Sequence, residues 1–193
     1  AMVARKSPGK AEQLYQRLFE ILRSWSADTV QPLLSVLQQY SRFLMQQDRA
    51  EEVPAAIQRY RDALARAHGA GAGRMEEVLG MTVEFEQTRG SHERALAAAR
   101  ELLDLEESLN GKTSEPYLHA VERFADTCRA GNDSREAALR LQAVTLVDLV
   151  TPANDARRGF ARMNAALALA RQGQFDEADR LAAEAMAIGQ RLP

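Results

Sequence analysis

The residues of this chain that could carry out chemistry are one cysteine, three histidines and several pairs of acids. A nucleophilic thiolate needs a nearby base, and a zinc ion needs three or four His, Cys or carboxylate ligands held close together. Cys128 falls on the packed side of a predicted helix. His68, His92 and His119 are far apart in sequence and lack acidic or cysteine neighbours at ligand spacing. We therefore predict no catalytic residue, no metal site, no cofactor and no enzyme activity.

Two further features invite a chemical interpretation, and both have a simpler one. The glycine-rich stretch 69–73 precedes a predicted helix, but no strand comes before it and no Lys-Ser/Thr pair follows. A phosphate-binding loop needs both, so we interpret the stretch as a turn between repeats. The paired acids at 51–52, 76–77 and 106–107 are interpreted as solvated helix charges.

Composition favours helices over sheets, because the chain is rich in alanine and leucine and poor in β-branched residues. With 25 basic and 27 acidic residues the net charge is −2, which argues against a broad nucleic-acid surface. No apolar run reaches the roughly 20 residues that a membrane span requires, and no secretory signal is recognisable. A single cysteine fits a reducing compartment. We expect a cytoplasmic protein that binds neither nucleic acid nor membrane.

Apolar and small residues recur at a nearly constant interval along the predicted helices. Ala11, Val53, Ala95 and Ala137 are spaced by 42 residues, and Ala178 follows after 41. Parallel tracks keep the same phase, one turn and two turns later in the same helices and again in the helices that precede them. Their members are Tyr15, Ile57, Ala99, Leu141 and Ala182; Leu18, Tyr60, Leu102, Val144 and Ala185; Leu37, Leu79 and Val121; and Ser41, Val83, Ala125 and Ala166.

This period indicates a repeated pair of antiparallel helices. Two helices approach closely only where their facing residues are small, and a single pair cannot bury its apolar face alone, so pairs must stack. The fold class that we predict is all-α, a right-handed α-solenoid with a concave inner face. An irregular bundle with accidental periodicity is the alternative.

The last unit, residues 163–188, carries the most specific motif. Ala166 lies in its first helix, and Gly173, Phe175 and Ala178 form a Gly-x-aromatic-x-x-Ala turn. This unit resembles a tetratricopeptide repeat, in which Phe175 would plug the end of the helix pair. Gly90 to Ala95 keeps the spacing with His92 in the aromatic position. In the third unit the glycine falls one place early, at Gly131, and the first unit is the most divergent.

The usual tetratricopeptide unit has about 34 residues. The longer period resembles the kinesin-light-chain-like variety that is common in bacterial proteins. HEAT and armadillo repeats have a similar period of about 40–47 residues but would not explain the recurring glycines and small residues.

The register predicts how the domain is organised. Residues 1–9 would be a disordered arm with a tag remnant, and 10–193 one repeat domain of a half repeat, 10–25, and four pairs. The expected helix pairs are 32–68, 75–109, 115–150 and 157–190. The chain ends without the polar helix that usually caps such arrays, so we expect Leu181, Met186 and Ile188 to lack a cover.

The resemblance implies that the first helix of each pair lines the concave face, where a peptide or partner domain would bind. Asn164 matches an asparagine that kinesin-light-chain-like repeats use to hold a peptide backbone, whereas the other units have Gln39, Met81 and Arg123 there. The predicted partner-binding residues are Gln38, Arg42, Gln46, Glu77, Met81, Glu84, Glu122, Arg123, Asp126, Arg129, Met163, Asn164 and Arg171.

Three functions are compatible with this reading. The first is a non-catalytic protein-interaction scaffold or adaptor. The second is a sensory or regulatory repeat domain that responds to a signalling peptide or small molecule. The third is an assembly module that forms a homodimer through the exposed array ends. An ordinary solvated inner face is the alternative to a binding surface.

Overall fold

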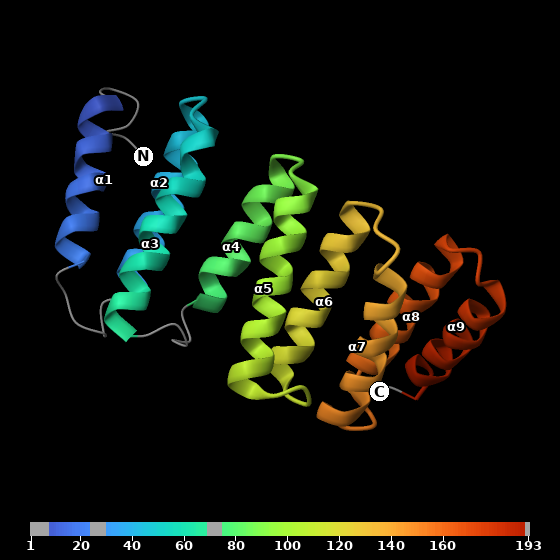
Figure 1. Cartoon of the computed structure of the whole chain (residues 1–193). Coiled ribbons are helices and arrows are strands. Elements are labelled where there is room, and N and C mark those ends of the chain that lie inside the picture. The colour runs from blue at the N-terminus through green and yellow to red at the C-terminus, as the bar shows by residue number, and fades with distance from the viewer. Residues whose placement is uncertain (1–7, 24–29, 69–74, 192–193) are drawn as a thin grey trace. The chain divides into compact units, whose positions relative to one another are not determined.

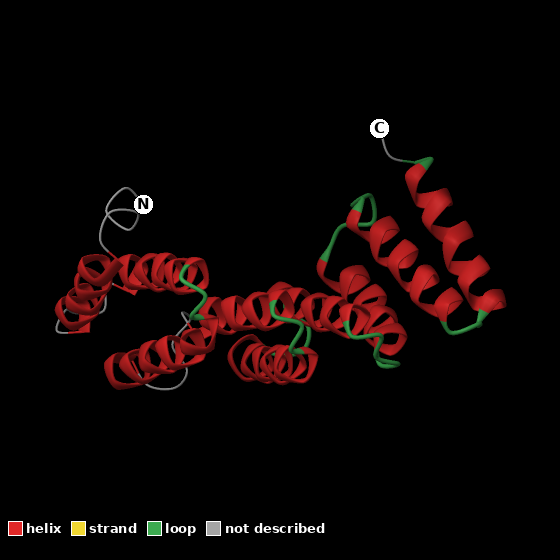
Figure 2. Ribbon diagram, turned by 90° about the horizontal axis from the view of Figure 1, so that it is seen from above, coloured by secondary structure: helices red, strands yellow, loops and turns green. Residues whose placement is uncertain are grey.

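The computed structural model describes residues 8–23, 30–68 and 75–191, and over these ranges it contains helices and no strand (Figures 1 and 2). The predicted all-α fold class is thereby confirmed. The chain divides into two compact units, Ala1–Thr82 and Val83–Pro193. Most of the predicted N-terminal arm and the glycine-rich stretch 69–73 lie outside the described residues.

In unit 1 the described helices are α1 (Pro8–Arg23), α2 (Val30–Gln46), the short 3-10 helix η2 (Ala50–Glu52) and α3 (Val53–His68). Helix α4 (Met75–Thr88) begins in this unit and ends in unit 2. Helices α1 and α2 are joined by an aromatic cluster in which the ring of Tyr15 lies 5.3 Å from that of Tyr40 and 5.6 Å from that of Phe43.

A charged cluster holds the turn after α2 against α1. The guanidinium of Arg49 donates to both carboxylate oxygens of Glu12, at 2.8 and 2.9 Å, and to Glu52 of η2 at 2.5 Å. This hydrogen bonding from Arg49 lowers the pKa of Glu12. The half repeat α1 is therefore attached to the following pair both by aromatic packing and by one bidentate ion pair.

In unit 2 the end of α4 is followed by α5 (His92–Asn110), α6 (Glu115–Ala130), α7 (Glu136–Val150), α8 (Arg157–Arg171) and α9 (Phe175–Gly189). Successive helices run antiparallel (Figure 1). Helices α6 and α7 form one pair, and α8 and α9 form the next.

The residues that share the 42-residue register form the interior. Ala95, Ala99, Leu37, Leu79, Val121 and Ala125 have no measurable exposure in their respective units. Other members of the tracks are also buried, among them Val53, Ile57, Tyr60, Val83, Leu102, Ala137, Ala166, Ala178 and Ala185. The recurring alanines are thus the close contacts that the spacing predicts.

Each turn within a helix pair contains one residue in the left-handed backbone region, at Asp48, Gly90, Asn132 and Gly173 (φ 57°, 71°, 53° and 76°). These positions repeat the sequence interval. The backbone hydrogen bond that closes each turn repeats as well, from the amide of the following residue to the carbonyl five residues earlier: Arg49 to Leu44, Ser91 to Glu86, Asp133 to Cys128 and Gln174 to Leu169. All four helices therefore end in the same Schellman-type turn.

This regularity corrects one detail of the sequence interpretation. Gly131, which looks one place early, has an ordinary φ of −93°, and the left-handed residue of the third unit is Asn132. Asparagine and aspartate tolerate this region better than other non-glycine residues do. The turn is therefore in register, although its glycine is not.

Substitution at Asn132 tests the importance of this geometry. Asn132→Ala is expected to lower the free energy of unfolding by about 1 kcal/mol, because alanine has no local side-chain hydrogen bond to offset the left-handed strain. Asn132→Gly should be neutral or slightly stabilising, since glycine adopts the same φ without that strain. Urea unfolding followed by circular dichroism measures both. Equal losses in the two variants would contradict a backbone origin.

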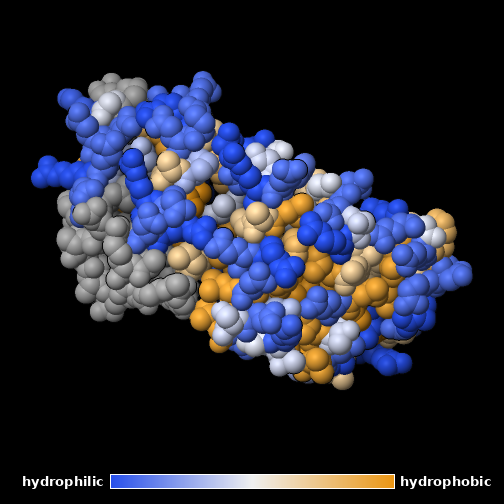
Figure 3. Space-filling model, viewed as in Figure 1, coloured by the Kyte–Doolittle hydropathy of each residue, from blue (hydrophilic) through white to orange (hydrophobic). Residues whose placement is uncertain are grey.

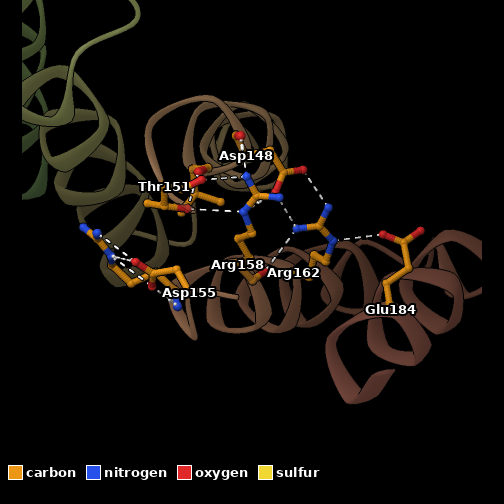
Figure 4. Close-up of polar contacts among 8 residues, drawn as sticks. Asp148, Thr151, Asp155, Arg158, Arg162 and Glu184 are labelled. Carbon is orange, nitrogen blue, oxygen red and sulfur yellow. Dashed lines mark hydrogen bonds and ion pairs between the residues drawn. The ribbon is translucent and has the colours of Figure 1, made fainter. Parts of the chain in front are cut away.

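Two arginines of α8 fix the last pair to α7 (Figure 4). Arg158 donates to the backbone oxygens of Asp148 and Thr151, at 2.6 and 2.7 Å, and so caps the end of α7. Arg162 bridges the carboxylates of Asp148 on α7 (2.7 Å) and Glu184 on α9 (3.0 Å). One guanidinium thus connects three helices.

The predicted role of Phe175 as a plug of its helix pair is wrong, because its side chain is 65% exposed. His92, at the equivalent position, lies against the turn of the next pair, where it would be 3.5 Å from a side chain at Gly131. At this position His92 therefore contacts the following pair. No helix among the described residues covers Phe175 in that way. Of the three residues expected to lack a cover, Met186 is exposed, Ile188 is half-buried and Leu181 is buried.

Candidate functional site

The predicted partner-binding residues all lie on the first helices of the pairs, α2, α4, α6 and α8. Those in unit 1 are Gln38, Arg42, Gln46, Glu77 and Met81, and those in unit 2 are Glu84, Glu122, Arg123, Asp126, Arg129, Met163, Asn164 and Arg171. Glu77, Met81, Glu122, Arg123 and Asn164 are half-buried, and the others are exposed. We call the exposed and half-buried residues of α6 and α8 that share this phase the first-helix face of unit 2.

Most charged members of this face are paired within the chain. Arg123 donates to Glu84 on α4 (3.3 Å), and Arg157 at the start of α8 donates to Glu115 at the start of α6 (2.5 Å). Asp126 lies 3.3 Å from Arg129 on the same helix. The first two pairs join residues of successive first helices about one repeat apart, so these charges are neutralised within the chain.

Asp126 and Arg171 also belong to a partly buried network that reaches α7. Arg140, 5% exposed, donates to Asp126 at 2.5 Å and lies 3.9 Å from the buried carboxylate of Glu136. Arg171 donates to the same Glu136 at 2.6 Å. Charged side chains of three helices therefore form one network of ion pairs. Asp126 and Arg171, which the sequence predicts as partner-binding residues, also have a structural role in this network.

Glu122 differs from its neighbours because the structure shows no ion pair or hydrogen bond for its half-buried side chain among the described residues. Burial raises the pKa of its carboxyl group; the charges of His119, Arg140 and Arg157 lower this pKa and the charge of Asp126 raises it, and the net shift is upward.

The pKa shift of Glu122 predicts an unusual pH dependence. Because its pKa is raised above the ordinary 4.5 in the folded protein, the ionised carboxylate destabilises the fold. Glu122→Gln should therefore raise the free energy of unfolding at neutral pH, and the gain should vanish as the pH falls through the folded pKa to below 4.5. Urea unfolding at a series of pH values measures this.

Asp133 supplies the matched control with the opposite sign. Hydrogen bonds from the side chain and backbone of Arg135 lower its pKa from 3.8 to about 2. Asp133→Asn should therefore destabilise the fold at neutral pH, and this loss should disappear as the pH falls from 3.8 to about 2. Changes of the same sign in the two variants would contradict the assignment of Glu122.

An apolar stripe lies beside these charges on α8. Phe160, Met163 and Leu167 are 68%, 41% and 51% exposed, and their spacing places them on one face of the helix. Phe160 was missed by the sequence analysis. The signal was available, because Phe160 occupies the register position of His119 and stands one turn before Met163. Asn164 and Arg171 share this face.

Exposed large apolar residues also occur on second helices of unit 2. Leu109 ends α5, Leu149 is near the end of α7, and Phe175 and Met186 lie on α9. On the face drawn in Figure 3, orange patches of apolar residues gather over this unit. Apolar exposure in unit 2 is therefore not confined to one side, but Phe160, Met163 and Leu167 are the set that falls on a single stripe of one helix.

The candidate reactive residues offer no chemical site within the described part of the chain. The thiol of Cys128 is fully buried, and burial raises its pKa to about 11, so it is protonated at neutral pH. Cys128 is a buried small residue, as predicted. In the ranges that the structure covers, no three His, Cys, Asp or Glu side chains gather in a way that could hold a metal ion. None of the described helices has the length and hydrophobicity needed to cross a membrane.

The fold matches solved structures, although the sequence matches no known family. No protein-family model matches the chain, and a search of curated proteins finds no match. The structure of BtubC (BKLC) from P. vanneervenii superimposes with a TM-score of 0.67, at 16% identity, over 94% of this chain and 72% of that one. The fold is that of kinesin-light-chain-like tetratricopeptide repeats.

A second structure supports the same assignment. The kinesin light chain nearly identical TPR-like repeats of Podosopora anserina match with a TM-score of 0.64 and 14% identity. The match covers 95% of this chain and 97% of that one. The tetratricopeptide fold predicted from the 42-residue register is confirmed, and it explains why α2, α4, α6 and α8 are equivalent positions.

Proposed function

We propose that the protein is a non-catalytic interaction scaffold of the bacterial cytoplasm, which binds a peptide or a partner domain on the concave face lined by its first helices. The observation that carries the proposal is the stripe of uncovered large side chains on α8, Phe160, Met163 and Leu167. Contiguous exposed apolar residues usually mark an interaction surface. The burial and high pKa of Cys128 agree with a role that involves no covalent chemistry.

The polar groups around the stripe suit recognition of a polypeptide. Asn164, half-buried on the same face, has an amide that can donate to and accept from a peptide backbone. The exposed ion pairs of Arg123 with Glu84 and of Arg157 with Glu115 link neighbouring first helices and leave the apolar stripe uncovered.

A selection experiment tests the proposal. The chain is used to enrich binders from a library of displayed random peptides, and binding of the enriched peptides is measured by fluorescence anisotropy. In a variant that combines Arg42→Glu, Arg123→Glu and Asn164→Ala on the first helices, we expect affinity to fall by about tenfold or more. The control variant combines Arg59→Glu and Arg100→Glu on the exposed sides of α3 and α5 and should bind normally. Equal binding by both variants would rule out the first-helix face.

A homodimer is the second candidate function, and it rests on α9. Phe175 and Met186, 65% and 59% exposed, stand where no described helix covers them. Two copies that stacked through this helix would bury both residues. Sedimentation analysis of the intact chain over a range of concentrations tests this, and a strict monomer at high concentration would exclude it.

A further inference from the structure

From the first-helix face of unit 2 we infer the chemistry of the partner: a polypeptide segment that presents a large apolar side chain next to a lysine or arginine. This inference rests on the proposed function. The apolar side chain would pack on the stripe of Phe160, Met163 and Leu167, and the cation would pair with Glu122. The apolar half of this partner is inferred from exposed side chains on α8, and its basic half from an unpaired carboxylate on α6.

The apolar half follows from the difference between α6 and α8. At the register positions of Phe160, Met163 and Leu167, helix α6 has His119, Glu122 and Asp126. The preceding first helix is thus polar where α8 is apolar. Phe160 is 68% exposed although aromatic side chains contribute most when buried, so a partner that covers it gains free energy from apolar burial. Anchors of this type commonly dominate binding.

The charged half follows from the pairing of the other groups. Glu115, Arg123, Asp126, Arg157 and Arg171 each have an oppositely charged partner in the chain. Glu122 forms no ion pair or hydrogen bond among the described residues, and its side chain is half-buried. A bound cation would neutralise it, whereas a carboxylate or phosphate would be repelled. Charge complementarity therefore favours a basic partner residue over an acidic one.

The carboxylate of Glu122 and the apolar stripe of α8 lie on neighbouring first helices. The hydrogen bond from Arg157 to Glu115 (2.5 Å) brings the first residue of α8 beside the first residue of α6. Glu122 stands at the register position of Met163, the middle residue of the stripe, so the carboxylate and the stripe lie at the same level along the two helices. A short segment can reach both at once, with its apolar and basic residues close in sequence.

The peptide selection described above tests this inference by the composition of the enriched sequences. We expect them to combine Phe, Leu or Met with a nearby Lys or Arg. The variant Phe160→Ser with Leu167→Ser should bind these peptides about tenfold more weakly or worse. Leu149→Ser, an equally exposed apolar residue on α7, is the matched control and should have no effect. If the double variant does not fold, as judged by circular dichroism, Phe160→Ala alone is measured in its place.

Reversing the charge of Glu122 tests whether the partner presents a basic residue there. Selection on the Glu122→Lys variant should replace the basic residue of the enriched peptides by an acidic one, whereas Glu93→Lys on α5 should leave the preference unchanged. Enriched peptides without this apolar and basic pattern, or an unchanged preference in Glu122→Lys, would overturn the inference. If binding ignores the α8 variants but is lost with Arg42→Glu, Arg123→Glu and Asn164→Ala, only the inference fails. If it ignores both sets, the proposed function fails as well.

Discussion

Replacing Arg140 by alanine is expected to lower the free energy of unfolding by about 3 kcal/mol. Arg140 is almost completely buried on α7, where it donates to Asp126 at 2.5 Å and lies beside Glu136. Removing one partner of a buried ion pair costs about 3–5 kcal/mol, because the remaining charge has lost both water and its counterion. The loss should fall at the lower end because Asp126 is exposed to water and Glu136 retains Arg171.

The measurement is urea unfolding followed by circular dichroism, with Arg100→Ala as the matched control. Arg100 forms an exposed pair with Asp104 one turn along α5, and such pairs contribute about 0–1 kcal/mol. Arg140→Met separates charge from packing, since methionine retains much of the buried stem. Losses of similar size for Arg140→Ala and Arg100→Ala would contradict a structural role for the network.

The second large effect is expected from enlarging a buried alanine. Ala99→Leu should destabilise the protein by about 1–3 kcal/mol, because the added methyl groups must displace a neighbouring helix. Ala99 has no measurable exposure, whereas Ala97 on the same helix is exposed. Ala97→Leu should therefore change the free energy of unfolding by no more than about 0.5 kcal/mol.

Comparing these two variants isolates packing, since alanine and leucine have similar helix propensities and the positions are two residues apart. Thermal or urea unfolding serves equally well. A neutral Ala99→Leu would show that α5 does not pack closely against its neighbours, and the interpretation of the 42-residue register as a packing pattern would then be wrong.

The sequence predicted the helix pairs and their interior because both depend on local spacing. Ala95, Ala99 and Ala137 recur at the interval that places them at helix contacts, and they are buried. The left-handed residue of the third turn is Asn132 and not the neighbouring Gly131, so a glycine pattern alone does not locate it. Backbone geometry selects the position, and Asn132 can adopt that geometry.

The candidate site was harder to predict because its charges are set by partners in other repeats. Arg171 and Glu136 are far apart in sequence, and only the fold shows that Arg171 is already paired. Phe175 was expected to plug its own pair but is 65% exposed, and His92 at the equivalent position lies against the turn of the next pair. The spacing places Phe160 and Glu122 on first helices, but only the structure shows that Phe160 is uncovered and that Glu122 has no ion pair among the described residues.

The bridge made by Arg162 has a consequence for hydrogen exchange. Since Arg162 belongs to α8 and its guanidinium binds Asp148 on α7 as well as Glu184 on α9, the end of α7 stays attached to α8 even when α9 separates. Arg158, one turn earlier, caps that same end through the carbonyls of Asp148 and Thr151. The amides of α8 and of the end of α7 should therefore open together as one cooperative segment, and α9 can fray without them.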